Sequence, residues 1–236
     1  MSVALKLQEW KSQELNLHWE GTFEDYLGLI EKNPNIANTA HARIYDMIEA
    51  AGIETVNGRK IYHFFDGELY GLDATLERLV EEYFHSAARR LDVRKRILLL
   101  MGPVSGGKST LVTRLKRGLE EYSRTDRGAA YGIKGCPMHE EPLHLIPHHL
   151  RPEMEKTLNV HIEGELCPVC QLRVQEEFNG DVLAMPVERI LFSEGKRVGI
   201  GTFSPSDPKS QDISELTGSI DFSTIAEYGS ESDPRA

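Results

Sequence analysis

Apolar residues in the first fifty positions recur at the spacing of amphipathic helices. Phe23, Tyr26, Leu27 and Ile30 follow one another at three- and four-residue steps, and Pro34 then interrupts the pattern. This spacing places the four side chains on one face of a helix. The sequence therefore predicts a helix that ends shortly before the proline.

A second helix is predicted between Thr39, a favourable N-cap residue, and Gly52, a favourable stop. Its apolar positions share one face, and they are Ile44, Met47, Ile48 and Ala51. Gly58 and the residues that follow it, as far as position 65, indicate a short turn and strand. We therefore expect residues 1–65 to form a helical N-terminal extension.

The next segment predicts a helix, a strand, a glycine-rich loop and another helix. The turn at residues 70–73 opens a long amphipathic helix. Its apolar face comprises Leu76, Leu79, Val80, Tyr83, Phe84 and Ala87. The apolar run at residues 97–101 is typical of a strand buried on both faces of a parallel sheet. A further helix is expected from Lys108 to about Tyr122, and this order of elements predicts an α/β fold with a parallel sheet flanked by helices.

The glycine-rich loop matches the pattern G-x-x-x-x-G-K-[ST] at every fixed position. Its glycines allow backbone N–H groups to approach phosphate oxygens, and the following helix adds its positive N-terminal end. Lys108 is expected to reach the β- and γ-phosphates, and the Ser109 hydroxyl to coordinate Mg²⁺. The residues assigned to nucleotide binding are Gly102, Pro103, Val104, Ser105, Gly106, Gly107, Lys108, Ser109 and Thr110.

A chance match in a turn of small residues is the alternative. It is disfavoured because a strand pattern stands directly before the loop and an amphipathic helix directly after it. We therefore predict a P-loop NTPase domain over residues 66–236 that binds ATP with Mg²⁺.

Hydrolysis would also need an acidic residue after a second apolar strand, to orient Mg²⁺ and water. The nearest pattern, residues 190–194, ends in Glu194, but Ser193 intervenes and Gly195 follows. The sequence thus supports binding better than hydrolysis. The last residues before Ala236 have loop composition, so we expect the chain to be truncated.

The net charge and the lengths of the apolar segments limit the classes of binding partner that are expected. The chain has 236 residues and a formal net charge of −10, so no overall field attracts nucleic acid or anionic lipid. The basic clusters at residues 89–90 and 94–96 are expected to be solvated helix ends. The apolar run at 97–101 is far shorter than the roughly 20 residues that span a bilayer, and no signal-peptide pattern begins the chain. We expect a cytoplasmic protein that binds nucleotide and a protein substrate.

All three cysteines lie within residues 134–172, at the spacing of metal ligands. Cys136 with His139, and Cys167 with Cys170, form two knuckles that can present four ligands to a tetrahedral ion, which predicts a structural zinc site. Three alternatives stay open. The cysteines could be ordinary buried thiols, the C-x-x-C pair could be redox-active, or another histidine could be the fourth ligand. The competing histidines are His144, His148, His149 and His161.

Several stretches resemble the PrkA-type serine protein kinase family, whose N-terminal part is an AAA+ ATPase domain. They are residues 21–27, 40–48, 70–73, 84–88 with 102–109, and 199–203 with 210–218. The resemblance implies an AAA+ domain with the 70–73 turn near the adenine, a homo-oligomeric ring, and serine kinase activity in the full-length protein. Family members are longer, which implies that the second acidic motif and the kinase-like region follow Ala236.

Kinase chemistry itself is not visible in these residues. The chain has no H-R-D catalytic loop and no D-F-G motif. Because AAA+ proteins usually remodel other proteins, an ATP-dependent remodelling or protease-associated machine is the rival hypothesis. A nucleotide-switched binding module without catalysis is the third.

Overall fold

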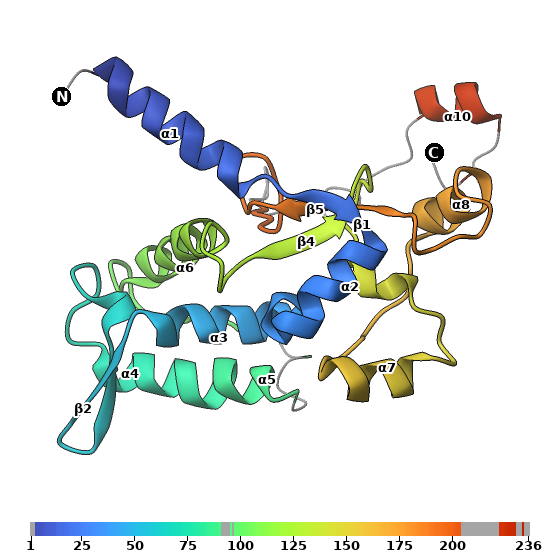
Figure 1. The fold of residues 1–236 in the computed structure, drawn as a ribbon. Helices are drawn as coiled ribbons and strands as arrows, with labels where there is room; N and C mark the ends of the chain where they lie inside the picture. The colour runs from blue at the N-terminus through green and yellow to red at the C-terminus, as the bar shows by residue number, and fades with distance from the viewer. Residues whose placement is uncertain (1–2, 91–94, 96, 204–221, 230–232, 234–236) are drawn as a thin grey trace.

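The computed structural model describes residues 3–90, 95, 97–203, 222–229 and 233 (Figure 1). The N-terminal part contains α1 (Val3–Leu17), β1 (Glu20–Thr22), α2 (Phe23–Lys32), η1 (Pro34–Ala37), α3 (Ala40–Ala50), β2 (Ile53–Val56), β3 (Arg59–Tyr62) and η2 (His63–Phe65). Next come α4 (Asp73–Arg78), η3 (Leu79–His85), α5 (Ser86–Ala88) and α6 (Lys108–Tyr122). The remaining elements are β4 (Ala130–Ile133), η5 (Pro142–Leu145), α7 (Arg151–Leu158), α8 (Pro168–Glu176), β5 (Pro186–Ile190) and α10 (Phe222–Tyr228).

Both helices predicted in the first fifty residues are confirmed. α2 begins after Thr22, whose hydroxyl accepts a hydrogen bond from the Asp25 backbone N–H at 3.2 Å. The Asp25 carboxylate accepts in turn from the Thr22 backbone N–H at 2.8 Å. This reciprocal capping box satisfies two backbone donors that the first helical turn would otherwise leave unpaired. α3 begins after Thr39, and Gly52 follows its end with a φ of 105°.

A buried arginine joins α3 to the start of β4. The Arg43 guanidinium donates to the carbonyl oxygens of Gly128 and Ala129 at 2.8 Å each, and to that of Ile36 at 2.9 Å. A buried charge is tolerated when its donors are satisfied in this way. Arg43 therefore joins η1, α3 and the residues that lead into β4.

The middle of the chain forms a hairpin and the predicted long helix. β2 and β3 pair around Asn57 and Gly58, whose φ values of 52° and 78° suit a two-residue turn. The helix predicted after the 70–73 turn is confirmed as α4, η3 and α5, with η3 a π-helical stretch at its centre. α3 lies between this long helix and α6 (Figure 1).

The predicted parallel sheet is not formed by the described residues. β5 pairs with β1 and with β4, and both pairings are antiparallel, with Gly21 opposite Val187. Residues 97–101, predicted as a buried strand, are not in a strand, and Ile97 and Met101 are 93% and 82% exposed. A central strand needs neighbours to pair its backbone N–H and C=O groups, and no strand in the described part of the chain pairs with this run.

Two hydrophobic cores hold the described elements together. One packs α2 against β4, β5 and α8, with Tyr26 and Val187 among its fully buried members. The other packs α3 and η2 against the long helix, with Ile48 and Val80 fully buried. Each core contains residues from both sides of position 65, so the boundary between the two cores does not coincide with that position. The division into residues 1–65 and 66–236 stays a prediction.

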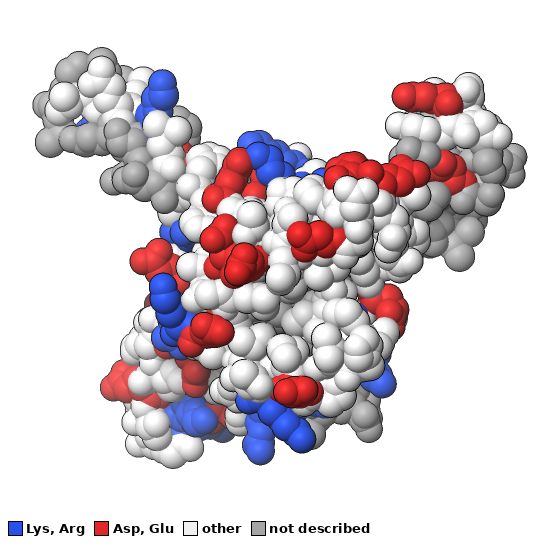
Figure 2. All heavy atoms as spheres, turned by 45° about the vertical axis from the view of Figure 1, so that its right-hand side comes forward, with Lys and Arg blue, Asp and Glu red and all other residues white. Residues whose placement is uncertain are grey.

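The surface carries charges of both signs. On the face drawn in Figure 2, acidic and basic side chains are interspersed, and the residues drawn there in colour form no broad basic patch. Among the described residues, no helix combines the length and the apolar character needed to cross a membrane. The family-like stretch at residues 210–218 lies outside the described residues.

Candidate functional site

The glycine-rich loop leads directly into α6, as predicted. α6 begins at Lys108, and Gly107 is its N-cap residue with a φ of 76°. A Cβ at Gly107 would lie 3.1 Å from Leu69 Cδ2 and 3.4 Å from Leu72 Cδ1. Glycine thus serves two purposes here, because it adopts the left-handed conformation without strain and allows the loop to pack closely on the 69–72 segment.

The Lys108 side chain folds back over its own loop. Its ammonium group donates to the carbonyl oxygens of Gly102, at 2.9 Å, and Pro103. The loop is closed further by a hydrogen bond of 3.2 Å from the Gly106 backbone N–H to the Pro103 carbonyl. The two carbonyl contacts hold the Lys108 ammonium group over residues 102 and 103 of the loop.

A hollow of about 560 Å³ lies against the loop. Its lining residues are Glu68, Leu69, Tyr70, Leu72, Ser105, Gly106, Gly107, Lys108, Ser109 and Thr110. The Ser109 and Thr110 residues are exposed, so their hydroxyls are open to a ligand. The apolar and aromatic residues come from the 70–73 turn and the residue before it, so this turn lies beside the loop. The hollow therefore has a cationic, hydroxyl-bearing side and an apolar side.

Glu68 is a residue of this hollow that the sequence patterns did not single out. It is the one carboxylate among the described residues that line the hollow, and it pairs with Arg117 of α6 at 3.5 Å. Its position two residues before the 70–73 turn is the signal that could have found it.

Glu194, the nearest match to a hydrolytic acid, is engaged elsewhere. Its carboxylate accepts from Lys116 Nζ at 2.5 Å and from the Thr202 hydroxyl at 2.6 Å. The hydrogen bond from Lys116 is the main cause that lowers the pKa of this carboxyl. Glu194 is not among the residues lining the hollow at the loop, and this geometry agrees with its poor sequence pattern.

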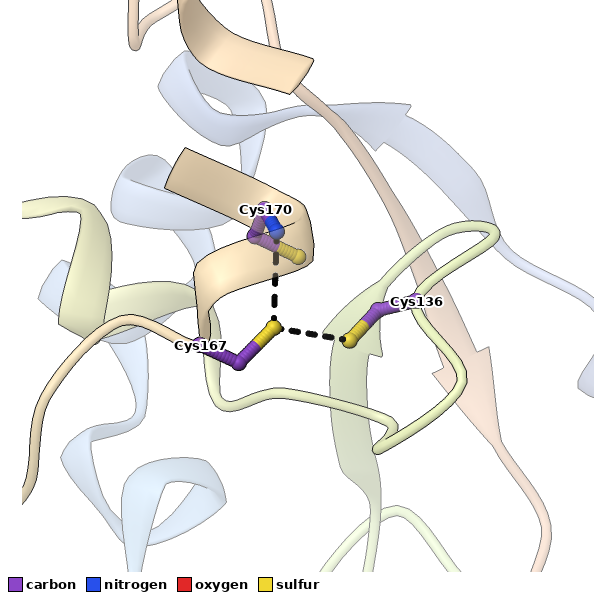
Figure 3. A group of neighbouring side chains, drawn as sticks. All are labelled: Cys136, Cys167 and Cys170. Carbon is purple, nitrogen blue, oxygen red and sulfur yellow. Dashed lines mark hydrogen bonds between the residues drawn. The ribbon is translucent and has the colours of Figure 1, made fainter. Parts of the chain in front are cut away.

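The three cysteines converge from two segments (Figure 3). Cys136 follows β4, whereas Cys167 and Cys170 stand at the start of α8. Their three Sγ atoms all lie within 4.8 Å of one another, and the Sγ atoms of Cys136 and Cys167 are 3.6 Å apart. Burial raises the pKa of the Cys167 and Cys170 thiols.

The histidine predicted as the fourth ligand is not brought to the thiols. His139 is exposed and lines a hollow together with Glu188 and Arg189, on the side of β5. It does not belong to the group of ligand atoms within 4.8 Å of one another, which among the described residues comprises the three cysteines. The turn that separates it from Cys136 directs the two residues to different surroundings.

Three of the four competing histidines are paired with acidic residues. His144 contacts Glu140 and, at 2.7 Å, the Glu163 carbonyl. His148 contacts Glu165 at 2.6 Å, and His161 contacts Glu155 at 2.8 Å. The fourth, His149, is exposed.

Comparison with known proteins gives a family match that includes the glycine-rich loop. Residues 21–236 match the PrkA AAA domain family. Over its whole length the chain is 65% identical to the ATP-dependent protease PrkA of Bacillus subtilis (strain 168) and covers 37% of that protein. Over 232 residues the chain is 28% identical to the serine/threonine kinase YeaG of Escherichia coli (strain K12). This alignment covers 92% of the present chain and 35% of the relative. No solved structure matches significantly.

The chain therefore spans little more than a third of the length of these two relatives. The family match extends over nearly all of it, from residue 21 in β1 to the last residue, and includes the loop at residues 102–109. On this basis the chain belongs to the PrkA AAA domain family.

Proposed function

We propose that the chain binds ATP with Mg²⁺ in the hollow at residues 102–110. The observation that carries the proposal is the combination of a glycine-rich loop, the start of α6 and an apolar wall within one hollow. The loop amides and the helix N-terminus suit a polyphosphate. Leu69, Tyr70 and Leu72 suit the base and sugar, which have less charge.

Individual roles follow from the side-chain chemistry. Lys108 would exchange its two carbonyl partners for phosphate oxygens, because an ammonium group binds an anion more strongly than a neutral carbonyl. Ser109 would give its hydroxyl to Mg²⁺, which prefers oxygen ligands. The metal, when bound, supplies charge neutralisation at the phosphates.

A matched pair of lysines on α6 tests the proposal. Lys108→Ala should abolish most binding of a non-hydrolysable ATP analogue in a calorimetric titration. Lys116→Ala should leave it nearly unchanged, because Lys116 contacts Glu194 and does not line the hollow. Circular dichroism checks that both variants are folded. Unchanged affinity in Lys108→Ala would refute the assignment.

We further infer that the domain drives ATP-dependent protein processing in the full-length protein. Support comes from the name of the relative that is 65% identical, an ATP-dependent protease. Serine kinase activity, the expectation from the family resemblance, is the second candidate and is supported by the name of the relative at 28% identity. Assembly into a homo-oligomeric ring and a cytoplasmic location belong to the same proposal.

The two activities are separated with the full-length protein. It is incubated with ATP and casein, an unstructured protein, and both peptide release and transfer of labelled phosphate to serine are measured. ATP-dependent peptide release without labelling supports proteolysis, and labelling without release supports the kinase. Either activity should vanish in Lys108→Ala, since both depend on the same nucleotide site.

A further inference from the structure

The cysteine cluster is outside the nucleotide site and unused by the proposed function. Cys136 and Cys170 belong to the core formed by α2, β4, β5 and α8, and are 4% and 0% exposed. The nucleotide hollow lies instead against Leu69 and Leu72, which pack on the other core. The two sites therefore belong to different packed regions.

The backbone around the cysteines has the form of a ligand-presenting turn. The Cys170 backbone N–H donates to the Cys167 Sγ at 3.4 Å, so Cys167 caps α8 with its sulfur. On the other side, the Cys136 backbone N–H donates to the Ile133 carbonyl at 3.1 Å, which closes the turn after β4. Each segment thus directs sulfur toward the same point (Figure 3).

The two segments are held together by more than their sulfur atoms. Arg173 of α8 donates to the Lys134 carbonyl at 2.8 Å, next to the turn that carries Cys136. This contact preorganises the three thiols, and preorganisation lowers the entropy that a bound ion must offset. The Sγ separation of 3.6 Å between Cys136 and Cys167 is also far longer than a disulfide bond of about 2.0 Å.

We propose that Cys136, Cys167 and Cys170 bind one Zn²⁺ ion and that Glu140, rather than His139, completes the site. Three sulfur ligands at this separation select a soft or borderline ion, and Zn²⁺ accepts both thiolate and carboxylate ligands in tetrahedral sites. The ion replaces the thiol protons and joins the turn after β4 to the start of α8.

Glu140 is the acidic residue placed beside the knuckle. Its carboxylate accepts from the Cys167 backbone N–H at 3.2 Å, and it also contacts His144. Its side chain is only 11% exposed, so it is held where a cation on the sulfurs would attract it. Its carboxylate, like the His139 ring, lies outside the group of ligand atoms within 4.8 Å of one another. Unlike His139, it already contacts the Cys167 backbone, so direct ligation requires only a turn of the side chain toward the sulfur atoms, and His144 then keeps the carboxylate oriented.

Metal analysis of the wild-type chain is the first test. Protein purified without added metal should contain about one equivalent of zinc, and its thiols should react with Ellman's reagent only after chelation. Co²⁺ added to the chelated protein should give the intense absorption of a tetrahedral thiolate site. Absence of zinc with three freely reactive thiols would overturn the proposal, as would a disulfide between two of them.

Variants then identify the ligands. Cys170→Ser should lose the ion, and His139→Ala should keep it with unchanged affinity. Glu140→Gln should weaken zinc binding by at least the roughly 10- to 100-fold that is lost when a partner of a metal ligand is removed. Loss of zinc in His139→Ala, or full affinity in Glu140→Gln, would overturn the choice of the fourth group. If Cys170→Ser does not fold, the Co²⁺ titration of the wild-type protein still decides the question.

Discussion

Lys108 and Ser109, to which the proposed function assigns contacts with phosphate and Mg²⁺, occupy the first turn of α6 together with Thr110. At this scale the sequence motif and the structure agree, because the motif specifies backbone conformation as well as side chains. Gly107 permits the left-handed turn, and the helix that follows sets the direction of the lysine and the hydroxyls. The role of each residue can therefore be tested singly.

Ser109→Ala should weaken binding of the Mg²⁺-nucleotide complex more than binding of metal-free nucleotide. The reason is that only the metal loses a ligand, whereas the loop amides and Lys108 are unaffected. Titrations with and without Mg²⁺ measure the two affinities, and Thr110→Ala, at the neighbouring exposed hydroxyl, is the matched control. Equal weakening in both titrations would mean that Ser109 supports the loop and not the metal.

The apolar run at residues 97–101 shows how an element depends on its neighbours. Its sequence is that of a buried strand, yet the run is largely exposed, and no strand in the described ranges pairs with it. The run does line a hollow of about 730 Å³ together with α4 and η3. The local sequence thus favours a strand, but a strand forms only where a neighbouring strand pairs with its backbone.

Two leucines test this description of the run. Leu99 is 73% exposed and Leu143 is 1% exposed. In this chain, Leu143→Ala should lower the free energy of unfolding by about 2–5 kcal/mol, the range for a buried leucine. Leu99→Ala should change it by less than about 0.5 kcal/mol, as exposed substitutions do. Denaturant unfolding measures both, and comparable losses would show that the run is packed in solution.

On the scale of the whole molecule, two carboxylates are candidates for the acid that hydrolysis needs, and of these Glu68 lines the hollow at the loop and Glu194 does not. Glu194 is bound by Lys116 and Thr202, and Glu68 is paired with Arg117. Neither carboxylate follows a strand that lies beside the loop. We therefore expect ATP binding without efficient hydrolysis in this chain.

We expect this chain by itself to hydrolyse ATP far more slowly than about 1 per second, the lower end of ordinary enzymatic turnover. The described residues place no free carboxylate after a strand beside the loop, so the attacking water and Mg²⁺ would be poorly oriented. Phosphate release at saturating ATP measures the rate, and Glu194→Gln should leave it unchanged. Turnover at or above that level, lost in Glu194→Gln, would show that this carboxylate is the missing acid.

What the sequence determined by itself is local. The helices α2, α3, α4 to α5 and α6 follow from three- and four-residue apolar spacing, and the loop follows from its glycines and lysine. Each of these patterns acts within a few turns of chain, so residues close in sequence carry the information.

What only the tertiary structure decided involves residues far apart in the chain. The antiparallel pairing of β1 and β4 with β5, the burial of Arg43, and the convergence of Cys136 on Cys167 without His139 are of this kind. The sequences of strands that are three to five residues long are too short to predict which strands pair. Their pairing is selected by the burial of side chains between distant segments and by the need to satisfy every buried backbone group, which no local pattern records.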